Sequence, residues 1–192
     1  DRLASELVGC FRYMWFEAGG TLDASYSAQF YDLGRLAGFG GAMLELGRFC
    51  IRPGAQDADI LRLAWGALTG IMDRGGGALM FGCASFRGIE PAPYAEAFAL
   101  LRARHMAPER WRVGVRAAEV VRFADMGAGA EVDARAGMRA VPPLLRSYLS
   151  MGGWVSDHAV VDRDMNTLHV FTGVETAAIP PARARALRAI LG

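Results

Sequence analysis

A charged strand, a helix and a second apolar strand follow one another near the middle of the chain. Residues 43–52 are mostly apolar, as expected of a strand, but include Glu45 and Arg48. Burying either charge is costly unless the charge is paired or used for chemistry. Residues 57–74 repeat apolar side chains with a helical period, and residues 78–86 form a second apolar run. This order predicts a right-handed crossover between parallel strands, and therefore an α/β fold.

The predicted helix places its apolar side chains on one face, and the glycines that follow it mark its end. Asp57 or Asp59 can cap its first turn. We expect this face to pack on a sheet. Its apolar positions are Ile60, Leu61, Ala64, Leu68, Ile71 and Met72.

Further strands and short helices surround this unit. Apolar and aromatic runs predict strands at 7–16, 154–162 and 167–175. Prolines open a helix that runs to about residue 105, and Pro142 divides a helical segment at 133–151. Residues 27–33 predict a short strand or a helical turn, and 180–192 a basic helix or tail.

Composition limits the class of protein. The 192 residues fit one domain, and 53% hydrophobic content is ample for a core. A net charge of +1 gives no argument for nucleic acid. All 21 basic residues are arginine, so lysine chemistry is excluded. Three cysteines without metal or CxxC spacing favour a reduced, cytoplasmic protein, and no apolar run reaches the ~18 residues of a membrane span.

Two pairs of motifs carry a family resemblance. ELGRFCI at 45–51 followed by FGCASF at 81–86 resembles the ornithine acyltransferases, also called hemolysin-like, of the GNAT superfamily. PPLLRSYL at 142–149 and DRDMNT at 162–167 resemble the C-terminal half of that family, with Met165 where Phe is expected. The match covers most of residues 7–175.

The resemblance implies a fold and a reaction. The fold is a single GNAT-like domain over residues 1–192, with three α-β-α layers around a mixed, largely antiparallel sheet. Relatives carry a further strand and helices before residue 7, which we expect to be missing here. The implied enzyme is an N-acyltransferase that moves a (3-hydroxy)acyl chain from acyl carrier protein to the α-amine of L-ornithine, the first step of ornithine lipid biosynthesis. It needs no cofactor beyond the carrier's phosphopantetheine arm.

Glu45 is the candidate general base, and Arg48 the residue that orients or anchors a substrate. On a regular strand these two side chains would point to opposite faces. Gly47 between them suits a β-bulge, which would bring both to the site and separate the strand from its neighbour. The alternative is a structural ion pair between Glu45 and an arginine.

The acyl-pantetheine arm is expected between the two central strands, where backbone N–H groups would hold the thioester oxyanion. A Cys83 nucleophile with His105 as its base is the alternative, but direct transfer needs no covalent intermediate, and Cys83 also suits a small buried apolar position. The expected binding residues are Phe49, Cys50, Ile51, Arg52, Phe81, Gly82, Cys83, Ala84 and Ser85.

The turn after Arg52 favours a carrier-protein donor over coenzyme A. It lacks the spaced glycines of a pyrophosphate nest and contains Asp57 and Asp59. Arg52 and Arg62 would meet the single phosphodiester of the arm. Six arginines within 102–122, Arg112 and Arg116 among them, would dock an acidic carrier, although a solvated basic face explains them too.

Other interpretations remain open. An acyl-homoserine lactone synthase has a similar fold and donor, and a truncated paralogue would bind the carrier without turnover. His158, Asp162, Asp164 and His169 match no metal template, so we expect no metal. Three arginines and three aliphatic residues, Leu187, Ile190 and Leu191, would give the tail weak, reversible contact with the inner membrane face, or only a solvated helix.

Overall fold

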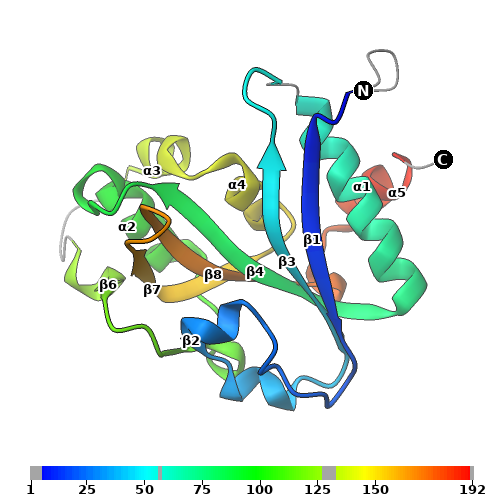
Figure 1. Ribbon diagram of the computed structural model, residues 1–192, viewed down its shortest axis with the longest axis horizontal. Coiled ribbons are helices and arrows are strands. Elements are labelled where there is room, and N and C mark those ends of the chain that lie inside the picture. Colours follow the sequence, from blue (N-terminus) through cyan, green and yellow to red (C-terminus); the bar gives the residue numbers. More distant parts are fainter. Residues whose placement is uncertain (1–5, 56–57, 127–132, 191–192) are drawn as a thin grey trace.

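The computed structural model describes residues 6–55, 58–126 and 133–190. Its main sheet has six strands in the order β1-β3-β4-β8-β7-β6 (Figure 1). Only β3 and β4 run parallel; every other neighbouring pair is antiparallel, which confirms the predicted mixed sheet. The strands are β1 (Gly9–Phe16), β3 (Ala42–Ile51), β4 (Gly77–Arg87), β6 (Val120–Arg122), β7 (Trp154–Asp162) and β8 (Thr167–Glu175).

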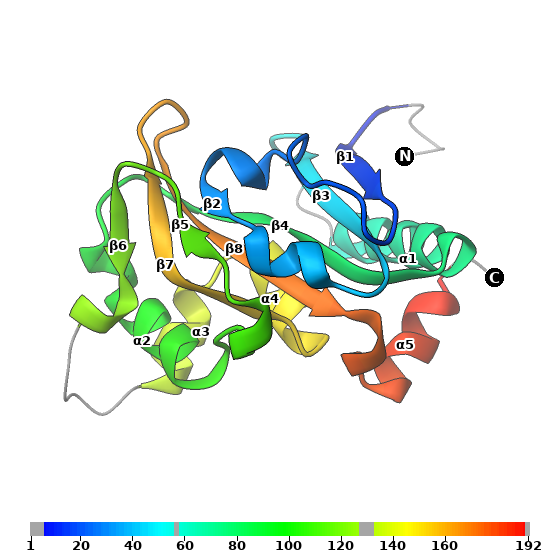
Figure 2. The ribbon, with the colours of Figure 1, turned by 90° about the horizontal axis from the view of Figure 1, so that it is seen from below.

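The five α-helices pack on one face of this sheet, and a layer of turns covers the other (Figure 2). The turn layer contains the two-stranded sheet of β2 (Tyr31–Asp32) and β5 (Gly114–Val115) and the 3-10 turn η1 (Ser27–Gln29). Three layers are present, but the second outer layer is not built from the α-helices that the prediction placed there. The helices are α1 (Ala58–Gly75), α2 (Ala95–Arg104), α3 (Ala134–Ala140), α4 (Pro143–Ser150) and α5 (Pro181–Arg188).

Helix α1 forms the crossover between β3 and β4, as predicted. Leu68 and Met72 of the expected apolar face are buried, and Ile60, Ala64 and Ile71 are partly buried. Trp65, which the predicted face omitted, is only 2% exposed and contacts Tyr148 of α4 edge to face. The buried stripe is therefore rotated slightly from the predicted one. Asp57, the possible cap, lies outside the described residues.

The C-terminal helix does not present its apolar face to solvent. Leu187 is 4% exposed within the helix-side core, and a Cβ added at Gly66 of α1 would lie 2.6 Å from Ile190. Arg188 forms two hydrogen bonds with Asp73 of α1. The expectation that Leu187 and Ile190 face a membrane is therefore wrong, because both cover α1; Leu191 lies outside the described residues.

In the part of the chain that the structure describes, no helix combines the length and the apolar character that crossing a membrane requires.

Candidate active site

The two central strands separate halfway along their length. The ladder between β3 and β4 ends at the pair Leu46–Gly82. Beyond it β3 stays paired with β1 as far as Ile51, and β4 stays paired with β8 as far as Arg87. A Cβ on Gly82 would lie 2.3 Å from the carbonyl oxygen of Leu46, so only glycine allows the strands to approach this closely before they diverge.

A β-bulge in β3 lies just after this point. The register with β1 shifts between the pairs Arg12–Gly47 and Cys10–Cys50, so Arg48 and Phe49 together oppose one residue of β1. The predicted bulge is therefore present. The left-handed residue is Arg48, with φ of 52°, and not Gly47. A non-glycine residue in this conformation costs about 1–2 kcal/mol, and such strain is often stored at functional sites.

A cleft of about 650 Å³ lies between the diverging strands, and its lining residues come from both sides of the sheet. Leu61 and Leu144 line it on the helix side, and Tyr26 and His169 line it on the turn side. Seven of the predicted site residues line this cleft: Arg48, Phe49, Cys50, Ile51, Cys83, Ala84 and Ser85.

Three predicted binding residues do not line the cleft. Phe81 is fully buried and stacks on Phe171 in the turn-side core. Gly82 lies at the closed end, under the backbone of Leu46. Arg52 lies beyond the bulge and forms an exposed ion pair with Glu6 at 2.5 Å. Phe81 lies before the point where β3 and β4 separate, and Arg52 lies past the end of β3, so neither reaches the open part of the gap.

Glu45 is buried, 3% exposed, beneath the segment that walls the turn side of the cleft. Its Oε1 accepts hydrogen bonds from Ser25 Oγ at 2.8 Å, Ser27 N–H at 2.7 Å and Ser27 Oγ at 2.6 Å. Its Oε2 accepts one bond, from the N–H of Tyr26 at 2.9 Å. The partners are thus hydroxyls and backbone amides, not the arginine that the alternative interpretation expected.

Cys83 adjoins this network. Its Sγ lies 3.5 Å from Ser27 Oγ. Burial raises the pKa of the thiol to about 12, and the nearby charges of Glu45 and Asp162 act in the same direction. A nucleophile needs the thiolate. The environment therefore disfavours the covalent alternative and suits a small buried side chain.

His169 and Tyr31 form a second buried polar group that the sequence analysis treated only as a possible metal ligand and a strand residue. Tyr31 Oη donates to the carbonyl oxygen of His169 at 2.8 Å and lies 3.1 Å from its Nδ1. Burial lowers the pKa of His169 to about 4. The neutral imidazole then donates from Nδ1 to Tyr31. Nε2, which has no hydrogen-bond partner among the described residues, keeps its lone pair.

The polar side chains of this site share one sheet face. Ser85 pairs with His169 across β4 and β8, and Glu45 pairs with Phe81 two residues before Cys83. The period of two along each strand puts these positions on the turn side. The sequence alone did not show that these side chains share the turn side of the sheet, because this depends on the register between the strands.

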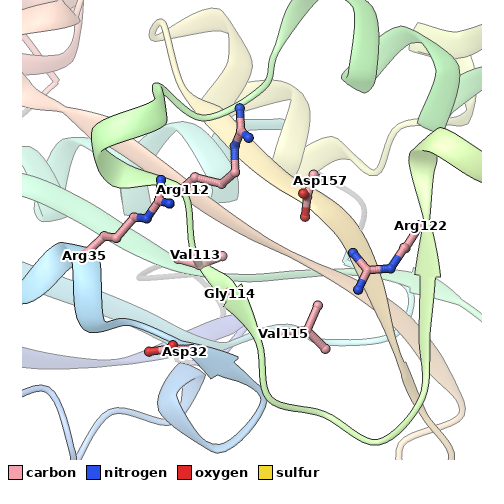
Figure 3. A pocket seen from close by; sticks show the side chains of 8 residues that line it. All are labelled: Asp32, Arg35, Arg112, Val113, Gly114, Val115, Arg122 and Asp157. Atoms are coloured by element: carbon pink, nitrogen blue, oxygen red, sulfur yellow. The ribbon is translucent and has the colours of Figure 1, made fainter.

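A smaller cavity of about 370 Å³ lies away from the cleft, and Figure 3 shows Asp157 between Arg112 and Arg122 there. The hydrogen bond with His158, aided by the two arginines, holds the pKa of Asp157 below its usual value. Arg112 also forms an ion pair with Glu109 at 2.8 Å.

The arginines of residues 102–122 do not form one patch. Arg102 and Arg104 belong to α2 on the helix side, whereas Arg112 and Arg116 lie in the turn layer. Arg116 donates to the carbonyl oxygen of Ala28 at 2.8 Å and so supports the segment next to Ser27. Proximity in sequence therefore overstated the extent of the predicted docking surface.

Neither phosphate-binding candidate of the turn after β3 points to an open anion site. Arg52 is paired with Glu6, and Arg62 is paired with Asp59 at 2.9 Å. Within the described residues, no group of three or more His, Cys, Asp or Glu side chains is arranged to hold a metal ion.

Known proteins resemble the chain over most of its length. Residues 1–66 match the acetyltransferase (GNAT) domain family. The chain is 33% identical over 173 residues to the L-ornithine N(alpha)-acyltransferase of Rhodobacter capsulatus, which is 90% of this chain and 66% of the relative. It is 29% identical over 167 residues to that of Rhizobium meliloti, 86% of this chain and 56% of the relative.

A third relative is the L-ornithine N(alpha)-acyltransferase of Brucella abortus, to which the chain is 30% identical over 168 residues. The match covers 86% of this chain and 59% of the relative. The chain thus spans about three fifths to two thirds of the length of these relatives. No solved structure matches it. The resemblance noted in the sequence is confirmed.

Proposed function

We propose that this chain, a homologue of the L-ornithine N(alpha)-acyltransferases, carries the centre of an enzyme that acylates the α-amine of L-ornithine. The single observation that supports this most is the cleft between β3 and β4, which opens to both faces of the sheet. The acyl-thioester arm would enter from the helix side, and the amine from the turn side.

The reaction needs the amine nitrogen to attack the thioester carbonyl. A new N–C bond forms, the C–S bond breaks, and the carrier's thiol leaves as the amine loses a proton. Beyond the Leu46–Gly82 pair the facing edges of β3 and β4 are no longer joined by the ladder. Backbone N–H groups on these edges would hold the arm and the oxyanion.

Glu45 is the proton acceptor in this proposal. Among the described residues its Oε2 accepts one hydrogen bond, so it can still take a proton. Glu45 does not line the cleft, so the proton would reach it through a water molecule. Arg48, held in the cleft by the bulge, would bind an anionic group of a substrate. The burial of Glu45 is compatible with its role as proton acceptor, because a bound substrate would leave most of the hydrogen bonds to Glu45 in place.

The proposed donor is the acyl-phosphopantetheine arm of acyl carrier protein. The turn after Arg52 supports this choice, because it lacks the spaced glycines of a pyrophosphate nest and contains two carboxylates. Membrane contact, if the enzyme makes one, would be a weak electrostatic contact of the exposed Arg183 and Arg185, since the aliphatic side chains of α5 cover α1.

The test is amide formation measured by mass spectrometry with acyl carrier protein thioester and L-ornithine. Glu45→Gln keeps an acceptor oxygen for Ser25 and Ser27 but removes the base, so we expect a loss of about 10²-fold or more in kcat. Normal turnover by this variant would make Glu45 an anchor only. Carrier binding without any product from the wild type would favour a non-catalytic paralogue, and a lactone product would favour a homoserine lactone synthase.

A further inference from the structure

The proposed chemistry leaves one buried carboxylate in the cleft without a role. Asp162, the last residue of β7, lines the cleft and is only 8% exposed. Its Oδ1 accepts the N–H of Met165 at 2.9 Å, in the turn that joins β7 to β8. This is the one hydrogen bond of the side chain in the described part of the chain. A buried carboxylate normally has a cation or several donors.

The turn does not explain the charge. The carbonyl oxygen of an asparagine side chain would accept the Met165 N–H equally well, because such turns need only one acceptor. The second oxygen of Asp162 therefore accepts no hydrogen bond from the residues that the structure describes, although the side chain lines the cleft. The neighbouring His169 does not supply a cation, since burial keeps it neutral at ordinary pH.

The cleft carries charges of both signs. Arg12 and Arg48 line it from β1 and β3, Asp162 lines it from β7, and Arg87 lines it from the end of β4. Tyr26 lines it too. Burial raises the pKa of its hydroxyl, with Cys83 and Asp162 adding to the rise, whereas Arg48 and Arg12 oppose it. A ligand that reaches from Arg48 to Asp162 meets a guanidinium at one end and a carboxylate at the other.

We infer that Asp162 binds the side-chain ammonium of the acceptor and so selects a diamino acid, while Arg48 faces its carboxylate. The inference rests on the proposed function, because it assumes that the amine enters from the turn side. An α-amino acid with an ammonium at the end of its side chain carries the two charges that this cleft complements. An acceptor without that ammonium would leave Asp162 buried and unpaired, which costs binding energy.

The test compares L-ornithine with L-2-aminopentanoate, which has the same carbon chain without the terminal amine. A hydrogen bond between charged groups is worth about 1.5–3 kcal/mol, so we expect wild-type kcat/KM to favour ornithine by about 10- to 100-fold. Asp162→Asn keeps the turn acceptor and should abolish this preference, mainly by raising KM for ornithine. Asp164→Asn, an exposed neighbour in the same turn, is the matched control and should keep it.

Binding of ornithine measured by calorimetry without donor separates this inference from the proposed reaction. Binding that weakens tenfold or more in Asp162→Asn, in an enzyme that forms no amide, would support the site and refute the reaction. A wild type that acylates both amino acids equally, or an Asp162→Asn variant that keeps the ornithine preference, would overturn the inference. If the variant does not fold, equal acylation of both amino acids by the wild type would still overturn the inference.

Discussion

Glu45 illustrates how far a single residue can be interpreted from sequence. A charged side chain in an apolar strand had to be paired or used, and the structure gives it four hydrogen bonds. The donors come from residues 25–27, some 20 positions away, which the loop before β3 folds back over the sheet. Short-range patterns do not encode that contact, so the alternative interpretation of Glu45 offered an arginine partner instead.

His169 gives a pH dependence that can be measured. Burial lowers its pKa from 6.5 to about 4, so between these values the unfolded chain binds a proton that the folded chain does not. Stability therefore falls as the pH drops through this window, and by linkage the loss between pH 7 and pH 5 is about 2 kcal/mol.

Urea unfolding at pH 7 and pH 5 measures this loss. His169→Gln removes the titrating group, so its free energy of unfolding should change less than that of the wild type over the same interval. His105→Gln is the comparison variant. Burial also lowers the pKa of His105, but this side chain is less buried than His169, so its replacement should change the pH dependence of stability less. If wild type and His169→Gln lose the same free energy of unfolding between pH 7 and pH 5, burial does not keep His169 neutral in the folded protein.

At the scale of elements, the central strands were predicted well and the turn layer was not. β7 and β8 match their predicted ranges because alternation and the turn at 163–166 define them locally. The bulge was predicted from Gly47, but the strain settled on Arg48. The short strand or turn predicted at 27–33 is present as η1 and β2, but β5, which pairs with β2, lies more than 80 positions away, so no local pattern could reveal that pairing.

The close approach of β3 and β4 predicts a strict requirement for glycine at position 82. Gly82→Ala would force its Cβ against the Leu46 carbonyl, and overpacking of this kind costs about 1–3 kcal/mol. Gly40→Ala is the control, because a Cβ there meets no atom within 4 Å. Urea unfolding should show a lower midpoint for the first variant alone; equal midpoints would mean that the strands can separate freely.

The bulge predicts that stability and activity respond differently at Arg48. Arg48→Gly relieves the left-handed conformation, and the greater entropy of glycine in the unfolded chain offsets part of that gain. We expect unfolding within about 1 kcal/mol of wild type but at least tenfold slower acyl transfer. A marked loss of stability would assign Arg48 to the structure and not to substrate binding.

At the scale of the whole molecule, the two faces of the sheet have different tasks. The helix side holds the larger apolar core, including α5, and the turn side holds the polar groups of the site. The sequence indicated the sheet, its helices and the strands that form the cleft. It did not indicate which surface residues meet, because arginines close in sequence lie on opposite faces.

Carrier docking is a prediction at this scale. Arg112 lies in the turn layer, opposite the helix side from which the arm would enter. Arg112→Glu should therefore leave KM for an acyl carrier protein donor unchanged, even at low salt, where attraction between a basic surface and an acidic carrier is least screened. The ion pair with Glu109 is exposed, and its loss should change stability little. A KM that rises severalfold at low salt would place carrier docking on the turn side.

The proposed acyl transfer takes place in the cleft between β3 and β4, so a side chain that blocks this cleft should stop the reaction. Ser85 is an exposed residue on its β4 wall, and a tryptophan there would fill the cleft without entering the core. The initial rate of amide formation by Ser85→Trp should fall at least 100-fold with an unchanged unfolding midpoint, whereas Ala37→Trp, on an exposed turn away from the cleft, should keep the wild-type rate. A fully active Ser85→Trp enzyme would contradict the account.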